Sequence, residues 1–168
     1  MHVHLTFEYA PKAERELSIE PEYGALFAAN AASKTLMAGF TSVRNLGDDG
    51  METISLRKAI NRGLVKGPRI FTAGKTIATT GGHGDPTNGM SKHDHTPPTP
   101  AEGVINSPHE ARKAVRQRYK DGADGIKITS TGGVLSVAKS GENPQFTDSE
   151  LAAICLLYTS DAADERLR

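Results

Sequence analysis

The 168-residue sequence predicts an α/β protein built on a parallel sheet. Short runs of alternating or apolar residues, typical of strands, take turns along the chain with longer segments of helical periodicity. Glycine stops and capping boxes mark the boundaries of those helical segments. Helices placed in this way between successive strands are typical of βα units, in which the strands lie parallel.

The first 72 residues contain three expected strands and two expected helices. In the first strand, Val3 and Leu5 alternate with two histidines, so the two sets face opposite sides. Apolar residues recur every three or four positions in the first helical segment. Gly39 and Gly63 follow the two helical segments as stops. The expected ranges are strand 1–6, helix 22–38, strand 41–46, helix 51–62 and strand 68–72.

Two further helices and a fourth strand are expected after a long irregular stretch. Ser107 and Glu110 form a capping box with a proline at the first helical position, and Thr147 forms another with Glu150. The stretch 73–106 is rich in Gly, Pro, Thr and His and has no clear element. It follows a strand, where α/β proteins place their sites. The expected ranges are helix 107–120, strand 124–129 and a helix that includes 151–154.

The composition excludes several classes of protein. Lys and Arg number 20, as do Asp and Glu, so the formal net charge is zero. This balance argues against a nucleic-acid-binding protein and against a polybasic membrane-surface module. The single cysteine excludes a disulfide framework. No apolar run approaches the ~20 residues of a transmembrane helix. We therefore expect neither a nucleic-acid partner nor a membrane partner.

His2 and His4 are the first candidate metal ligands. On a strand, residues two apart point to the same face and lie ~6–7 Å apart along the chain. Two imidazoles in this arrangement are able to converge on one divalent cation. The alternative is a flexible N-terminal tail that happens to contain histidine.

Lys127 is unusual because it lies between Ile126 and Ile128 in the fourth expected strand. A strand inside a parallel sheet is covered on both faces and is normally apolar throughout. A buried lysine loses its proton more easily, since desolvation disfavours the cation. The neutral amine reacts with carbon dioxide to form a carbamate, which is an anionic metal bridge. The alternative is an edge strand with Lys127 in solvent.

Three further groups of polar residues lie in loops. The glycine-rich loop around His83 suits close approach of backbone to a ligand, although a plain turn explains it equally well. His93 and His95 form a second His-x-His pattern among Lys, Thr and Pro, which favours a solvated loop. Asp48 and Asp49 follow the second strand and are expected in a solvated turn.

Several segments of the chain together resemble the amidohydrolase superfamily. Within it, the resemblance is to the imidazolonepropionase-like and Xaa-Pro dipeptidase-type metal-dependent hydrolases. Each segment alone is a weak signal, but their order and spacing match over about residues 1–154. The segments are MHVHL at 1–5, AGFTSVRN at 38–45, GPRI at 67–70, GGH at 81–83, GIKI at 125–128 and TGGV at 131–134.

The resemblance implies a partial (β/α)8 TIM barrel of about the first four βα units, with one or two zinc ions at the carboxyl ends of its parallel strands. His2 and His4 match metal ligands of the first strand, and Lys127 matches the carboxylated lysine that bridges two metals. His83 matches a histidine that we assign to substrate contact. The family also uses a histidine from the fifth strand, a histidine from the sixth and a general-base aspartate from the eighth. No residue of this sequence matches those three.

The implied activity is metal-dependent hydrolysis of an amide or peptide C–N bond in a small amide or dipeptide. Zinc supplies hydroxide at neutral pH and polarises the scissile carbonyl. Since the later ligands have no match here, we expect this chain to be inactive by itself and, with open sheet edges, prone to self-association. The alternative is a non-catalytic βα fragment that binds a ligand or partner.

The two ends of the sequence lead to a division into two parts. Residues 1–154 are expected to form the N-terminal half of an amidohydrolase barrel, truncated at both ends. The family's first strand normally begins several residues before the His-x-His pattern, whereas Met1 directly precedes His2 here. Residues 155–168 are expected to be a non-native tail. When back-translated, they resemble the end of a transposon-based sequencing adapter; the alternative is a native helix.

Overall fold

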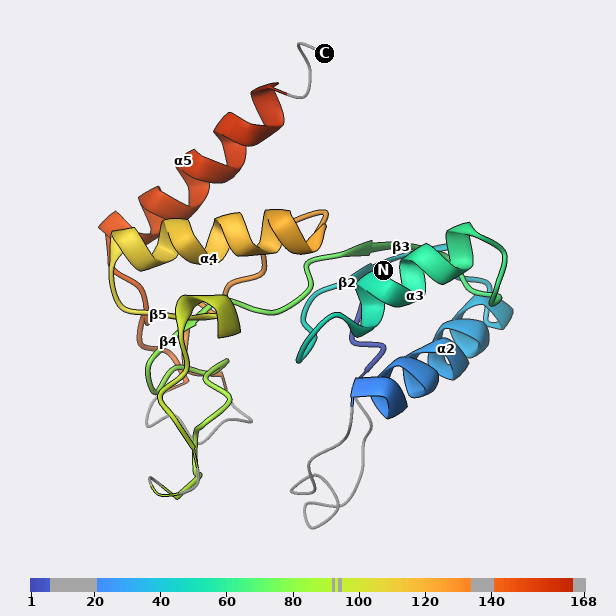
Figure 1. Cartoon of the computed structure of the whole chain (residues 1–168), viewed down its shortest axis with the longest axis horizontal. Coiled ribbons are helices and arrows are strands. Elements are labelled where there is room, and N and C mark those ends of the chain that lie inside the picture. Colours follow the sequence, from blue (N-terminus) through green and yellow to red (C-terminus); the bar gives the residue numbers. More distant parts are fainter. Residues whose placement is uncertain (7–20, 92, 94, 134–140, 165–168) are drawn as a thin grey trace. The chain divides into compact units, whose positions relative to one another are not determined.

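The computed structural model describes residues 1–6, 21–91, 93, 95–133 and 141–164, without the side chains of 158–164. The chain forms two compact units (Figure 1). Unit 1 comprises Met1–Lys75 with Asp121–Gly125, and unit 2 comprises Thr76–Lys120 with Ile126–Arg168. Asp94 and Val134 of the predicted motifs, and residues 165–168 of the predicted tail, lie outside the described residues.

Unit 1 is a parallel three-stranded sheet in the order β1-β2-β3. Its strands are β1 (His2–Val3), β2 (Ser42–Asn45) and β3 (Arg69–Thr72), and its helices are α2 (Pro21–Met37) and α3 (Glu52–Asn61). In the register of the sheet, His2 pairs with Arg44, and Arg44 pairs with Phe71. The parallel arrangement and all five elements predicted over 1–72 are confirmed, although the first strand is shorter than expected.

The alternation within each strand decides which face of this sheet is buried. Val43 and Ile70 point to the buried face, where they pack with Leu5 and with the small residues Ala28 and Ala32 of α2. The opposite face carries the exposed side chains of His2, Arg44 and Phe71. The two faces differ because successive side chains of a strand alternate in direction. His2 of β1 is therefore on the face that α2 and α3 leave uncovered, and His4, just after the strand, is exposed as well.

Unit 2 contains a smaller parallel sheet and two helices. Strands β4 (Ala78–Thr79) and β5 (Val104–Ile105) pair in parallel, and a 3-10 helix η1 (Pro100–Glu102) precedes β5. Helices α4 (Pro108–Asp121) and α5 (Asp148–Asp164) follow. β4, η1 and β5 lie in the stretch 73–106, for which the sequence showed no element. Two or three residues are too few to show a periodicity.

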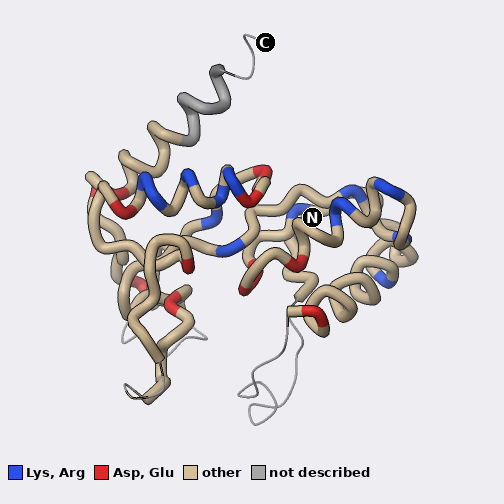
Figure 2. Tube along the Cα trace, viewed as in Figure 1, with Lys and Arg blue, Asp and Glu red and all other residues tan. Residues whose placement is uncertain are grey.

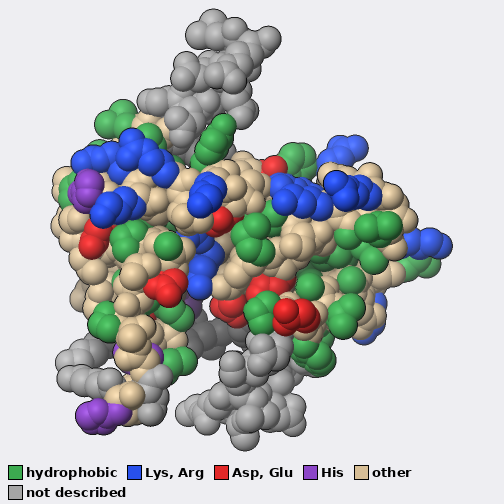
Figure 3. All heavy atoms as spheres, viewed as in Figure 1, with side chains coloured by type: hydrophobic (Ala, Val, Ile, Leu, Met, Phe, Trp, Pro, Cys, Tyr) green, Lys and Arg blue, Asp and Glu red, His purple; other side chains and the backbone are tan. Residues whose placement is uncertain are grey.

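Helix α4 shows why the predicted helix forms where it does. Ala111, Ala114 and Val115 face a core shared with Ile77 and Ile105. The other side of α4 is basic. Figure 2 marks the Lys and Arg positions along the helix in blue, and Figure 3 shows blue side chains over it. Its exposed basic residues are Arg112, Lys113, Arg116 and Lys120. An apolar stripe opposite a charged face is the usual pattern of a helix on the surface of a domain.

The predicted fourth strand, 124–129, is wrong in extent. Only Ile128 forms a parallel bridge, with Ile77. The hydrogen bonds are Ile77 N–H to the Lys127 carbonyl at 2.8 Å and Thr129 N–H to the Ile77 carbonyl at 3.1 Å. Asp124, by contrast, donates its N–H to the Thr72 carbonyl at 2.7 Å in unit 1. Asp124 is therefore not available to extend the same ladder.

The predicted non-native tail at 155–168 falls partly within α5. The helix continues without interruption to Asp164. No helix in the described part of the chain is both long and apolar enough to span a membrane.

Candidate functional site

The imidazoles of His2 and His4 lie close together on the uncovered face of unit 1. Their Nε2 atoms are 3.1 Å apart, and their ring centroids are 5.0 Å apart. Two nitrogen ligands of one tetrahedral zinc ion, each at ~2.0–2.1 Å, are separated by about 3.3 Å. The two Nε2 atoms therefore converge at a separation that fits shared coordination of one ion.

Two imidazoles would fill half of a tetrahedral coordination shell. Both side chains are exposed, so an ion has access to them from solvent. Within the residues described in both units, no group of three or more His, Cys, Asp or Glu side chains is placed to hold a metal ion. The geometry thus fits two protein ligands to a metal, with the remaining positions left to other donors.

Lys127 lies on the segment of unit 2 that pairs with Ile77. Its neighbours Ile126 and Ile128 pack against the core of unit 2. Lys127 itself is half-buried. A complete strand does not form around it, since only the adjacent Ile128 makes a bridge. The direction of its side chain stays a prediction from the alternation of a strand.

His83 lies at the tip of a tightly held loop in unit 2. Its backbone N–H donates to Gln145 Oε1 at 2.9 Å, and its ring lies against the backbone of Gly133. A Cβ at Gly133 would lie 2.7 Å from His83 Nδ1, and Gly133 has a φ of +66°. Only glycine meets both demands, since it has no Cβ and tolerates positive φ. The exposed His83 imidazole is therefore presented by a built loop rather than by a loose turn.

The side chain of Asp85 forms hydrogen bonds across the same loop. Its buried carboxylate accepts hydrogen bonds from the backbone of Gly81 at 2.8 Å, and from the backbone and hydroxyl of Thr87 at 2.9 and 2.7 Å. Burial would raise the pKa of the Asp85 carboxyl, but these hydrogen bonds together lower it below its ordinary value. The sequence reading gave Asp85 no role. A short polar side chain in a glycine-rich turn is the signal that could have found it.

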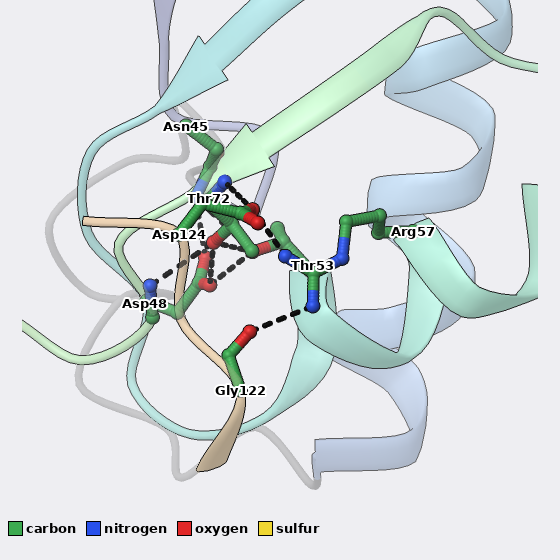
Figure 4. Close-up of polar contacts among 8 residues, drawn as sticks. Asn45, Asp48, Thr53, Arg57, Thr72, Gly122 and Asp124 are labelled. Carbon is green, nitrogen blue, oxygen red and sulfur yellow. Dashed lines mark hydrogen bonds and ion pairs between the residues drawn. The ribbon is translucent and has the colours of Figure 1, made fainter. Parts of the chain in front are cut away.

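A buried polar cluster lies at the carboxyl ends of β2 and β3 in unit 1 (Figure 4). It comprises Asn45, Asp48, Thr53 and Thr72. Asp48 accepts from the Asn45 amide at 2.8 Å and from the Thr53 hydroxyl. The hydroxyls of Thr53 and Thr72 are 2.7 Å apart. One set of hydrogen bonds thus joins the ends of two strands to the first turn of α3.

The expectation that Asp48 lies in a solvated turn is wrong. Its exposed fraction is 7%, whereas Asp49 is exposed. Burial raises the pKa of the Asp48 carboxyl from 3.8 to about 6, and the hydrogen bonds from Thr53 and Asn45 limit the rise. The signal in the sequence was Asn45 and Thr72, which are polar residues at buried positions of alternating strands.

The comparison with known protein families identifies one match. The pattern of the amidohydrolase family matches residues 1–165. Among curated proteins, the ochratoxinase of Aspergillus niger is 31% identical over 153 residues, which is 82% of this chain and 30% of the ochratoxinase.

Solved structures show the same relationship. An Xaa-Pro dipeptidase, with methionine bound in its active site, is 57% identical with a TM-score of 0.92, over 96% of this chain and 40% of the dipeptidase. A prolidase complexed with N-methylphosphonate-L-proline is 32% identical with a TM-score of 0.80, over 96% of this chain and 40% of that one. The chain thus spans 30–40% of the length of these relatives.

Proposed function

The chain belongs to the amidohydrolase family and has the fold of part of that family's barrel, and from this premise we propose that it supplies part of the metal centre of a hydrolase of amide or peptide C–N bonds. The observation that supports the proposal most is the convergence of His2 and His4. Their Nε2 atoms are 3.1 Å apart on an exposed sheet face. The hydrolase activity is proposed for a protein of the length of these relatives, of which this chain spans 30–40%.

His2 and His4 are the proposed ligands of a divalent metal, zinc in the first instance. Lys127 is the proposed bridging ligand after its amine is carboxylated by carbon dioxide. A metal bound in such a site supplies an activated water at neutral pH and polarises the scissile carbonyl. His83, held by Gln145 and Gly133, is proposed to contact the substrate.

The proposed substrate is a small amide or a dipeptide. The Xaa-Pro dipeptidase and the prolidase are the similar proteins whose names indicate this class. Proline at the second position makes the scissile bond a tertiary amide, which has no N–H to donate. The protein groups around the scissile bond would therefore have to recognise its carbonyl oxygen, and an exposed imidazole such as His83 is able to donate to that oxygen.

A chimera tests this proposal. Residues 1–154 of this chain replace the matching segment of the Xaa-Pro dipeptidase, and Xaa-Pro hydrolysis is measured with zinc and bicarbonate present. We expect activity that a chelator abolishes. His2→Ala, His4→Ala and Lys127→Ala should each lower kcat/KM by more than the ~10–100-fold typical of an outer-shell residue. His83→Ala should mainly raise KM.

Matched controls are available within the chain. His109 and Lys113 are exposed at the start and on the basic side of α4, so His109→Ala and Lys113→Ala should leave the activity unchanged. A folded chimera that binds zinc but does not hydrolyse dipeptides would contradict the proposal. That result would favour the alternative of a βα fragment that binds a ligand or partner without catalysis.

A further inference from the structure

The backbone next to His4 is held by a side chain that is distant in the sequence. Leu5 N–H donates to Asn45 Oδ1 at 2.8 Å. Up to Val3, β1 is tied to β2 by backbone hydrogen bonds, including Leu46 N–H to the Val3 carbonyl at 3.2 Å. At Leu5 the acceptor is instead the amide oxygen of a buried asparagine. The segment His2–Leu5, which begins as β1 and carries both histidines, is thus held at its end by Asn45.

Leu5 is anchored twice, and this decides the direction of His4. Its side chain is 3% exposed and packs in the core of unit 1, while its N–H is held by Asn45. His4 and Leu5 follow β1 directly, and His4 is exposed whereas Leu5 is buried, so a one-residue slip of this segment would exchange their places and carry His4 toward the core. Fixing Leu5 therefore fixes His4 on the exposed face, beside His2.

The orientation of the Asn45 amide is set by its other partner. Its Nδ2 donates to Asp48 Oδ1 at 2.8 Å and to the Gly47 carbonyl at 3.3 Å. If the amide were flipped, its oxygen would face the Asp48 carboxylate and its NH2 group would face Leu5 N–H. Both contacts would then be repulsive. Asp48 is held in turn by the Thr53 hydroxyl in the first turn of α3 (Figure 4).

We propose that Asn45 is a positioning residue, whose amide is oriented by Asp48 so that its oxygen holds Leu5 and thereby sets the imidazoles of His2 and His4 for a common ligand. The metal part of this statement rests on the proposed function. Asparagine is required because position 45 must accept from Leu5 and donate to Asp48 at the same time. An aspartate would accept from Leu5 but would place two carboxylates 2.8 Å apart.

An experiment that swaps the side chains of positions 45 and 48 tests the proposal on the full chain. Asn45→Asp keeps the acceptor for Leu5 but loses the donor to Asp48. The double variant Asn45→Asp/Asp48→Asn restores one acceptor facing Leu5 and one donor between the two side chains. Asn30→Asp, at an exposed position of α2, is the matched control. Two quantities are measured in each variant: hydrogen exchange at the Leu5 amide without metal, and zinc affinity by competition with a chelating dye.

We expect Asn45→Asp to lose protection of the Leu5 amide and zinc affinity, and the double variant to regain both. Asn45→Asp should speed exchange at Leu5 and weaken zinc binding by about 10–100-fold, the usual effect of losing an outer-shell partner. The double variant should recover both, and Asn30→Asp should change neither. Unchanged exchange at Leu5 in Asn45→Asp would overturn the proposal.

The two measurements, hydrogen exchange at Leu5 and zinc affinity, separate this proposal from the proposed function. If the unaltered chain binds no zinc, the metal centre of the proposed function fails, and exchange at Leu5 still decides the role of Asn45. If Asn45→Asp does not fold, the folded double variant replaces it. Rapid exchange at Leu5 in that variant, with zinc binding as in the unaltered chain, would overturn the proposal.

Discussion

At the scale of single residues, two histidines and two aspartates of this chain differ in their exposure to solvent. His2 and His4 are exposed and close together, which makes them accessible to an ion. Asp48 and Asp85 are buried and satisfied by neighbours, so they hold backbone and side chains in place. The residues proposed for chemistry are thus supported by polar residues with structural roles, as is usual around metal sites.

The pKa of Asp48 gives a prediction about stability and pH. Because burial raises that pKa in the folded chain from 3.8 to about 6, the folded state binds a proton more tightly than the unfolded state. The stabilisation that this proton provides is present at low pH and is lost as pH rises. The contribution of Asp48 to the free energy of unfolding should therefore fall by about 3 kcal/mol between pH ~4 and pH ~6.

The test compares two adjacent aspartates by urea unfolding at several pH values. Asp48→Asn should remove this part of the pH dependence, whereas Asp49→Asn, at the exposed neighbouring position, should retain it. Glu52 also acts on Asp48, and it is present in both variants. Equal pH dependence in the two variants would show that Asp48 does not carry the effect.

At the scale of elements, capping boxes mark where the helices begin. The Glu110 and Glu150 amides donate to the hydroxyls of Ser107 and Thr147 at 3.2 and 3.3 Å, as predicted before α4 and α5. The return hydrogen bond forms at Thr147 but not at Ser107, since the Glu110 carboxylate accepts from Asn106 N–H at 2.7 Å instead. A third box, at Thr99 and Glu102, begins η1 and was not predicted. It lies among prolines in a stretch without helical periodicity, so nothing nearby in the sequence indicated a helix there.

Removing one cap should destabilise α5 measurably. The Thr147 hydroxyl and N–H both donate to Glu150 at 2.8 Å, and Glu150 is buried. Thr147→Ala should lower the free energy of unfolding by about 1 kcal/mol, the typical value for a lost N-cap. Thr147→Ser keeps the hydroxyl and should cost much less. Urea unfolding followed by circular dichroism measures both, and equal losses would exclude the hydroxyl as the cause.

At the scale of the whole molecule, the proposed site residues are divided between two units. His2 and His4 belong to unit 1, and His83 and Lys127 belong to unit 2. The chain also spans only 40% of the dipeptidase and prolidase chains that it matches. A complete catalytic centre therefore has to draw on more residues than those identified here.

We predict that the purified 168-residue chain, loaded with zinc and bicarbonate, does not hydrolyse Xaa-Pro dipeptides. The reason is that the chain spans 40% of the dipeptidase that it matches, and the two later histidines and the general-base aspartate expected from the family resemblance have no match in the sequence. The dipeptidase chimera is the positive control, and a chelated sample gives the background. Hydrolysis that is abolished by the chelator and by His2→Ala would contradict this prediction.

Local patterns along the chain were enough to predict the class of fold and most of the helices and strands. Apolar periodicity, glycine stops and capping boxes are local signals, so they can be read without knowing what lies nearby. The same is true of the shared face of His2 and His4, which follows from the alternation of a strand. These features agree with the structure because no distant contact overrides them.

Which polar residues are buried, and which groups they hold, depends on contacts between distant parts of the chain. Asp48 lies in a turn, and its burial depends on Thr53 and Thr72, which come from later parts of the chain. The hydrogen bond from Leu5 to Asn45 joins residues 40 positions apart. The two-residue strands β4 and β5 exist because they pair with each other. Such contacts depend on distance in space, and one sequence records only distance along the chain.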